Sequence, residues 1–305
     1  MRYLAGRTVY MLIILAISSV AVFYAIRLSG GDATAARLPA SATEADRETL
    51  REVLGLNDPI YQQYFTYMGR LLSGDLGNSL TNNALISKMV IEHGRNSIIL
   101  GVAAFLLVFL VGVPLGMLAS VRRNTFTDQG IMSLSVAGMA VPNFWLALLS
   151  IWLFASVLGW LPSAGCCEPK QLILPAIVLA AEGTALTVRM TRSAMLENLD
   201  SDWVRTLRAG GLSEARVIGK HVFRNALIPI ISLAGLRIGQ IVGYALIVEV
   251  IFGWPGLGQV LVNAVLRRDY PVAQFFSLVL VVMVVLGNWF ADLGYLAANP
   301  RLRKI

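Results

Sequence analysis

Four polar side chains occur inside stretches of the sequence that are otherwise apolar. Arg237, Gln240 and Tyr244 follow one another in one such stretch, and Glu182 lies in the stretch before it. At 100° per residue, the first three fall within about 60° of one another on a helix. An arginine at the centre of a bilayer costs at least about 2.5–3.5 kcal/mol on insertion scales, so it should face a polar cavity or an opposite charge. Two interpretations stay open: a polar path across the membrane lined by these residues, or a structural ion pair of Arg237 with Glu182.

The same stretch carries glycine at every fourth position, at Gly235, Gly239 and Gly243. These residues lie on the side of the helix opposite Arg237. Small residues at this spacing allow close helix packing in membranes. The sequence therefore predicts a packed face and a polar stripe on one helix. Glu249 and Asp292 stand near the ends of apolar stretches, where a solvated or capping role is expected.

Cys166 and Cys167 are the only cysteines, and Glu168 follows them. Adjacent cysteines do not easily chelate one ion without other ligands, and His93 and His221 are expected on opposite membrane faces. A structural disulfide is favoured over a metal site. The sequence also lacks a convincing nucleophile–base pair, so no catalytic residue and no metal site are predicted.

The composition is that of a membrane protein, with 56% hydrophobic and only 14% charged residues among 305. Backbone N–H and C=O groups in hydrocarbon must pair internally, so long apolar runs should form helices. The net charge of +7 comes from basic residues between the apolar runs, which fits membrane topology and not a nucleic-acid partner. Six spans are predicted, the third tilted or broken near Pro142: Thr8–Ile26, Ser97–Val121, Gly130–Gly159, Leu172–Val188, Asn225–Val248 and Ala273–Ala291.

The basic residues set the expected orientation. With both termini in the cytoplasm, the cytoplasmic segments hold fourteen lysines and arginines, and the two short opposite loops hold three. By the positive-inside rule, this places the N- and C-termini in the cytoplasm of a multi-pass inner-membrane protein. The first span is expected to be a retained signal anchor.

The spans divide the chain into four parts: an N-terminal helix at 1–26, an extracytoplasmic segment at 27–95, a five-helix core at 96–298 and a cytoplasmic tail at 299–305. The extracytoplasmic segment predicts a helix around 42–54, capped by Ser41 or Thr43, and then a turn at 57–59. A small packed cap is expected there, and a substrate-binding module is the alternative.

The cytoplasmic loop at 189–224 is too polar to span a membrane and too regular for a linker. Ser201 and Asp202 are expected to cap a short helix, which Gly210 and Gly211 end because glycine adopts the left-handed conformation. A second helix should start near Ser213 and run on into the fifth span. Such a helix–glycine–helix element, joined rigidly to a span, would act as a lever.

This loop resembles the EAA loop of binding-protein-dependent ABC importer permeases, in particular those of the dipeptide/oligopeptide/nickel family. The first part of the family pattern is matched by Asp202, Arg205, Thr206, Arg208, Ala209, Gly211 and Leu212, and the second part by Arg224, Asn225, Ala226 and Pro229. The sequence departs from that pattern at Trp203, Leu207 and Gly210.

The resemblance extends along almost the whole chain. Further matching segments are residues 54–59, 74–77, 142–146, 159–162, 249–258, 268–271 and 299–303, and 29–32 replaces a turn that contains prolines in the family.

The resemblance implies six helices of the type I ABC importer permease kind. It also implies a second homologous permease, two ATPase subunits or domains, an extracytoplasmic solute-binding protein and surrounding membrane lipid. ATP and Mg would bind the partner subunits, and this sequence has no phosphate-binding loop of its own. The implied cargo is a short peptide, with nickel or a nickel chelate left open. A self-contained secondary transporter or channel, with Glu182 and Arg237 as its coupling site, is the alternative.

Overall fold

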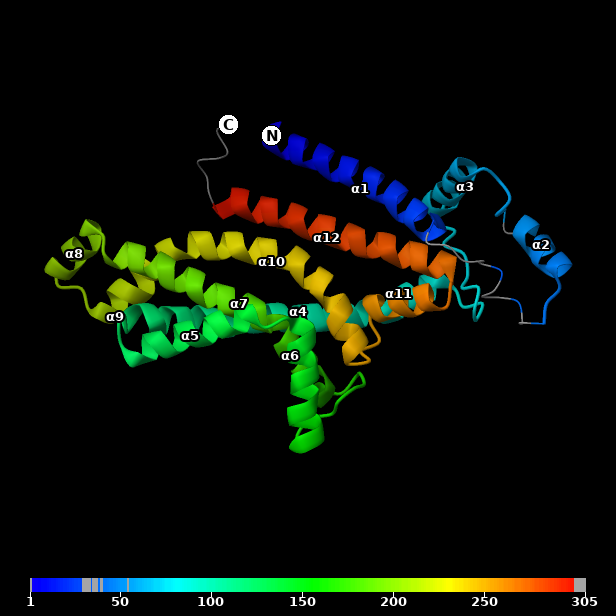
Figure 1. The fold of residues 1–305 in the computed structure, drawn as a ribbon. Helices are drawn as coiled ribbons and strands as arrows, with labels where there is room; N and C mark the ends of the chain where they lie inside the picture. The colour runs from blue at the N-terminus through cyan, green and yellow to red at the C-terminus, as the bar shows by residue number, and fades with distance from the viewer. Residues whose placement is uncertain (1, 29–33, 35–37, 39–40, 54, 299–305) are drawn as a thin grey trace.

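The computed structural model describes residues 2–28, 34, 38, 41–53 and 55–298, and within them the protein is built from helices (Figure 1). Long helices lie side by side in one bundle, and short helices connect them at both ends. In chain order the elements are α1 (Arg2–Leu28), α2 (Glu44–Val53), α3 (Ile60–Leu72), α4 (Ile86–Val121), α5 (Phe126–Ala140), α6 (Asn143–Ser150), the π-helix η2 (Ile151–Val157), α7 (Pro169–Leu199), α8 (Asp202–Ala209), α9 (Glu214–Arg216), the π-helix η3 (Val217–Val222), α10 (Phe223–Ile251), α11 (Leu257–Leu266) and α12 (Tyr270–Ala298).

Five helices in the described part of the chain are long and apolar enough to cross a membrane, and a bent pair brings the number to six if it is one span. All six predicted spans fall on these helices. Hydropathy marks only the apolar part of a helix, so the predicted ends fall short. The helix of the second span begins at Ile86, inside the segment predicted to be extracytoplasmic. The helix of the fourth span continues to Leu199, ten residues past the predicted start of the cytoplasmic loop.

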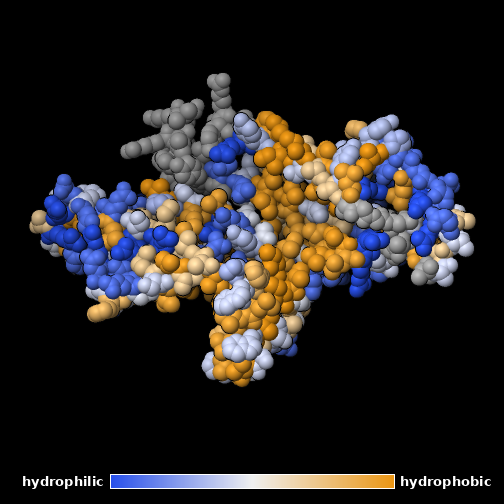
Figure 2. All heavy atoms as spheres, viewed as in Figure 1, coloured by the Kyte–Doolittle hydropathy of each residue, from blue (hydrophilic) through white to orange (hydrophobic). Residues whose placement is uncertain are grey.

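The third span is broken where the sequence predicted it. α5 ends at Ala140, α6 begins after Pro142, and the two parts are bent by 104°. Proline lacks a backbone N–H and disfavours helical conformation in the residue before it, which explains the break. α6 and η2 project sideways from the bundle (Figure 1), and their surface continues a hydrophobic belt across its middle (Figure 2). Both ends of the bundle are mainly hydrophilic in this view.

The most extensive helix packing joins α4 to α7, away from the glycine face predicted on the fifth span. A Cβ atom on Gly112 would lie 2.8 Å from Thr187 Cβ, and one on Gly116 would lie 2.6 Å from the Val188 carbonyl oxygen. On α10, Gly239 is in close contact with Asn288 of α12, but nothing lies within 4 Å of a Cβ atom on Gly243. The predicted packing face is therefore in close contact at Gly239, whereas Gly243 faces open space in this chain.

The segment between the first two spans contains two helices where one was predicted. Thr43 caps α2, because its hydroxyl oxygen accepts the Asp46 N–H (3.3 Å) while Asp46 accepts the Thr43 N–H (3.0 Å). α2 has no buried residue, so its exposed Val53 does not form the apolar contact expected of a packed cap. The predicted turn is present, and α3, which was not predicted, begins directly after Pro59. The motifs at 29–32 and 299–303, and Leu54, lie outside the described residues.

Candidate functional site

The short helix α8 stands at one end of the bundle, between the end of α7 and the start of α9 (Figure 1). Val204 is fully buried, and Leu207 packs with it in an apolar cluster. This cluster also contains Met195 of α7 and Ala226 of α10. The apolar side of α8 therefore packs in one cluster with η3, which leads into α10, and with side chains of α7 and α10.

The other side of α8 is exposed and polar. Six of the seven residues predicted for the coupling loop are exposed, and Leu212 is half-buried against the apolar cluster; the exposed ones are Asp202, Arg205, Thr206, Arg208, Ala209 and Gly211. The structure therefore brings the six exposed residues together on the accessible side of α8 and its turn. Trp203, where the sequence departs from the family pattern, is exposed beside them.

The turn after α8 has a definite geometry. The Leu212 N–H donates to the Leu207 carbonyl (3.3 Å), and the Gly211 N–H donates to the Arg208 carbonyl (3.0 Å). Gly211 has φ +82°, whereas Gly210 has an ordinary φ of −76°. These are the bonds of a Schellman motif with glycine at the left-handed position. The end of the helix predicted from the two glycines is confirmed. Position 211 is the one whose backbone conformation favours glycine.

An ion pair closes the same turn. Arg208 Nε and Nη2 donate to the two carboxylate oxygens of Glu214, at 2.7 and 3.2 Å. This hydrogen bonding raises the pKa of the Arg208 guanidinium. The predicted hydroxyl cap is wrong in detail, since Ser201 Oγ donates to the Asn198 carbonyl and accepts no N–H of α8.

Charged contacts also tie this end of α7 to α5. Arg192 of α7 makes a bidentate pair with Asp128 of α5, with N–O distances of 2.6 and 2.8 Å, and Asp128 is 3% exposed. Arg123 pairs with Asp200 at 2.9 Å, and both side chains are half or more exposed. Sequence reasoning missed Asp128 and Arg192, which lie 64 positions apart.

In the middle of the bundle, Arg237 of α10 meets Glu182 of α7, as predicted. The distance from Arg237 Nη1 to Glu182 Oε1 is 3.6 Å. Arg237 is 3% exposed, whereas the side chain of Glu182 is 30% exposed. Arg237 Nε and Gln240 Oε1 are both buried without a hydrogen-bond partner among the described residues. Tyr244 is partly buried and packs against the main apolar core.

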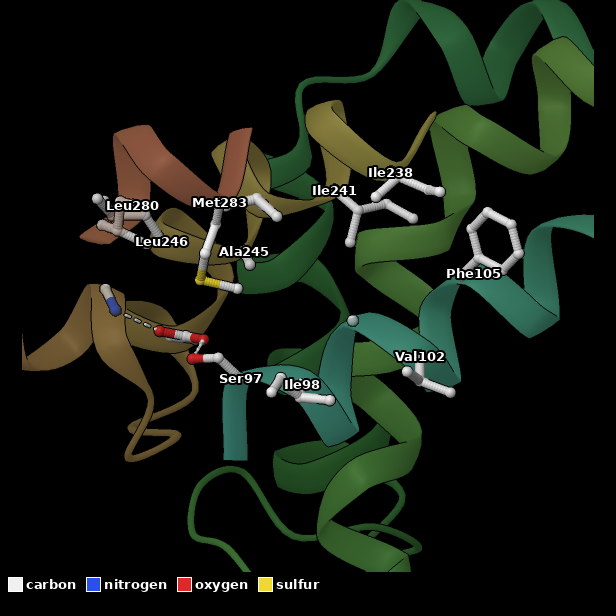
Figure 3. A pocket seen from close by; sticks show the side chains of 14 residues that line it. Ser97, Ile98, Val102, Phe105, Ile238, Ile241, Ala245, Leu246, Leu280 and Met283 are labelled. Atoms are coloured by element: carbon white, nitrogen blue, oxygen red, sulfur yellow. Dashed lines mark hydrogen bonds between the residues drawn. The ribbon is translucent and has the colours of Figure 1, made fainter. Parts of the chain in front are cut away.

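At the opposite end from α8, Glu249 organises the loop after α10. Its side chain accepts from Ser97 Oγ (2.6 Å) and from the Gly258 N–H (2.7 Å), so it caps α11 as expected (Figure 3). It is 1% exposed, however, and not solvated. Ser97 and Glu249 border a largely apolar cavity of about 310 Å³ between α4, α10 and α12. Asp292, the other carboxylate near a span end, pairs with Arg7 (3.3 Å).

Cys166 and Cys167 are joined by a disulfide, the favoured alternative from sequence. The loop that carries them contacts the loop after α10, where the Gly165 N–H donates to the Phe252 carbonyl. The disulfide therefore lies at the same end of the bundle as Glu249.

The described residues form a helical bundle with several helices long and apolar enough to cross a membrane, and comparison with known proteins identifies its family. The model of the family described as "Binding-protein-dependent transport system inner membrane component" matches residues 112–304, and that of its N-terminal part matches residues 1–87. The chain belongs to this family of importer permeases.

Individual relatives agree with this assignment. The chain is 36% identical over 311 residues to the oligopeptide transport system permease protein AppB of Bacillus subtilis, covering 98% of each. It is 41% identical over 278 residues to the di/tripeptide transport system permease protein DppB of Pseudomonas aeruginosa, covering 82% of this chain and 83% of that protein. Its identity with the glutathione transport system permease protein GsiC of Escherichia coli is 36% over 306 residues, with 99% of each chain covered.

A solved structure supports the fold. The inward-facing MetNI methionine ABC transporter contains a chain that matches with a TM-score of 0.60 at 19% identity, covering 70% of this chain and 97% of that one. The predicted type I permease fold is thereby confirmed.

Proposed function

We propose that this chain is the membrane-spanning subunit of an ATP-driven importer of short peptides, and that α8 receives the movement of the ATPase subunits. The observation that carries this proposal is the two-sided character of α8. Its polar side, with Asp202, Arg205 and Thr206, is free for a partner, while its apolar side is packed on α7 and α10.

Three contacts make α8 suitable for passing on a displacement. The buried Val204 fixes the helix axis, the Schellman turn at Gly211 fixes its end, and the pair of Arg208 with Glu214 closes the turn. Helices that are packed in this way move as rigid bodies. A push on α8 therefore moves the cytoplasmic ends of α7 and α10 together.

The same two helices carry the intramembrane polar group, and we assign it to the translocation path. Arg237 has only the 3.6 Å contact with Glu182 for its charge, and its Nε lacks an acceptor among the described residues. A buried guanidinium with spare donors is suited to a passing carboxylate or water. Displacement of α7 and α10 through α8 would change access to this pair, with Gln240 and Tyr244 on the same side of α10.

Peptide is the proposed cargo because the relatives compared above are named for oligopeptides, di- and tripeptides and glutathione. The proposed assembly has a second homologous permease, two ATPase subunits or domains that bind ATP and Mg, and an extracytoplasmic solute-binding protein. The distribution of basic residues supports cytoplasmic termini and a cytoplasmic position for α8.

The proposal is tested by measuring peptide uptake in cells that lack only this chain and in cells to which it has been restored. Restoring the chain should restore uptake of a labelled dipeptide or tripeptide, and uptake should depend on the ATPase subunits. Transport of Ni²⁺ but not of peptides would contradict the proposed cargo. Peptide uptake that continues without the ATPase subunits, driven by an ion gradient, would contradict the proposed class.

A further inference from the structure

The surface of α3 is divided into three parts along its length. Tyr64, Tyr67 and Leu71 are partly buried against the rest of the protein. Next to this packed side lies an exposed apolar edge of three residues, Tyr61 (61% exposed), Phe65 (69%) and Leu72 (82%). At 100° per residue these three fall within about 40° of one another.

The third part of the α3 surface is polar. Gln62, Thr66 and Arg70 are exposed, and they lie about 100–180° around the helix from Tyr61. An exposed apolar edge beside a polar edge is the pattern of a helix that lies in the surface layer of a membrane.

The packed side of α3 is anchored on α1, the first membrane-crossing helix. Tyr64 shares a hydrogen bond with the hydroxyl of Ser19 (2.8 Å), and its ring lies 5.3 Å from the ring of Phe23. Tyr67 also meets Phe23, at 6.0 Å between ring centres. Phe23 is completely buried by these contacts, so the height of α3 along α1 is fixed.

That height lies within the membrane. The apolar stretch of α1 is Gly6–Leu28, and at about 1.5 Å per residue Phe23 is about 7 Å and Ser19 about 13 Å short of its end. Hydrocarbon is about 30 Å thick, close to the length of this stretch. A helix docked at Phe23 is therefore level with the outer part of the bilayer, at the end away from α8 (Figure 1).

Most of the apolar surface of α1 is exposed in this chain. Only 11% of the most apolar part of α1 is buried inside this chain, and Ile17 and Val20 are exposed. At the end of the span, the Arg27 guanidinium lies 5.3 Å from the centre of the Phe23 ring and 5.8 Å from that of Tyr270, which ties this part of α1 to α12.

We propose that α3 is a lipid-binding helix. Tyr61, Phe65 and Leu72 insert into the acyl-chain region of the leaflet opposite α8, and Gln62, Thr66 and Arg70 face the lipid headgroups. This helix, in the segment where a small packed cap was predicted, would hold the first span and the extracytoplasmic loops at a fixed depth.

A photo-crosslinking experiment on the assembled importer in native membranes tests this proposal. p-Benzoylphenylalanine replaces Phe65 in one variant and Leu72 in a second, both on the apolar edge. It replaces the adjacent Thr66 in the matched control. After irradiation, mass spectrometry of the purified chain identifies the adducts.

The proposal predicts phospholipid adducts at positions 65 and 72 in several-fold excess over position 66. Adducts at 65 and 72 to a partner protein such as the solute-binding protein would overturn it and make α3 a protein-docking surface. Lipid adducts in equal yield at 65, 66 and 72, or none at 65 and 72 in an assembled complex, would also overturn it.

Discussion

Two neighbouring glycines at the end of α8 have different backbone requirements. Gly211 has φ +82°, where a side chain costs about 1–2 kcal/mol. Gly210 has φ −76°, and a Cβ atom there would meet its neighbours at ordinary distances of 3.5 Å or more. Residue type alone does not distinguish them, whereas the turn geometry does.

Gly211→Val should therefore strain the turn, displace α8 and uncouple ATP hydrolysis from peptide uptake. Gly210→Ala is the matched control and should keep both activities near wild type. Uptake and ATPase rates of the complete importer in proteoliposomes measure the effect. Wild-type uptake by a well-expressed Gly211→Val complex would count against α8 as the lever.

Arg237 is the second residue whose replacement has a specific predicted effect on transport. Arg237→Ala removes the buried charge that faces Glu182, so peptide uptake should fall more than the amount of assembled complex. Co-purification of the partner subunits, measured beside uptake, separates the two effects. If the complex fails to assemble and uptake per complex is unchanged, the pair is structural and does not line the path.

At the scale of elements, the contact of α4 with α7 depends on glycine. Gly116→Ala would bring Cβ to 2.6 Å from the Val188 carbonyl oxygen, and such overpacking costs about 1–3 kcal/mol. Gly243→Ala on α10 has open space and should be neutral in the purified chain. Thermal unfolding in detergent compares the two, and equal melting temperatures would show that this contact is loose.

The link between α5 and α7 should depend on one ion pair more than on the other. Asp128→Ala leaves Arg192 without its bidentate partner, and hydrogen bonds to charged groups contribute about 1.5–3 kcal/mol each. Arg123→Ala removes an exposed pair that is worth about 0–1 kcal/mol. Thermal unfolding of the two variants should differ accordingly. A larger loss for Arg123→Ala would reverse the assignment.

Several elements were predictable because their signals are local. The apolar stretches gave the spans, Pro142 gave the break in the third span, and Gly210–Gly211 gave the end of α8. Other features depend on tertiary contacts. A proline shows where a helix breaks, but the 104° bend is set by what α5 and α6 pack against. The pairing of Asp128 with Arg192 likewise requires two distant segments to meet.

Two features had local signals that went unrecognised. Gly112 and Gly116 have the spacing of the small-residue motif that brings helices close, although only the structure shows that they face α7. The apolar edge of α3 is present at Tyr61, Phe65 and Leu72, in a segment where only the helix around 42–54 was predicted. The seven residues predicted for the coupling loop came from the family resemblance, and the structure adds that Leu212 is half-buried.

At the scale of the whole molecule, the two hydrophilic ends and the hydrophobic belt between them have different proposed functions. The hydrophilic end with α8 is the proposed ATPase contact, the hydrophobic belt crosses the middle of the bundle, and α3 lies at the far end. The Arg237–Glu182 pair joins α10 to α7, and Glu249 caps the loop after α10, which the disulfide-bearing loop contacts. The proposed mechanism requires that an external ATPase contact α8 and that this contact change during the transport cycle.

Crosslinking from α8 in the working importer tests this requirement most directly. A photo-crosslinker in place of the exposed Arg205 should react with an ATPase subunit, and its yield should change between ATP-bound and nucleotide-free complexes. The same group in place of Gln62 on α3, at the other end of the bundle, should give no ATPase adduct. A transport-competent complex in which position 205 never crosslinks to an ATPase subunit would contradict the account.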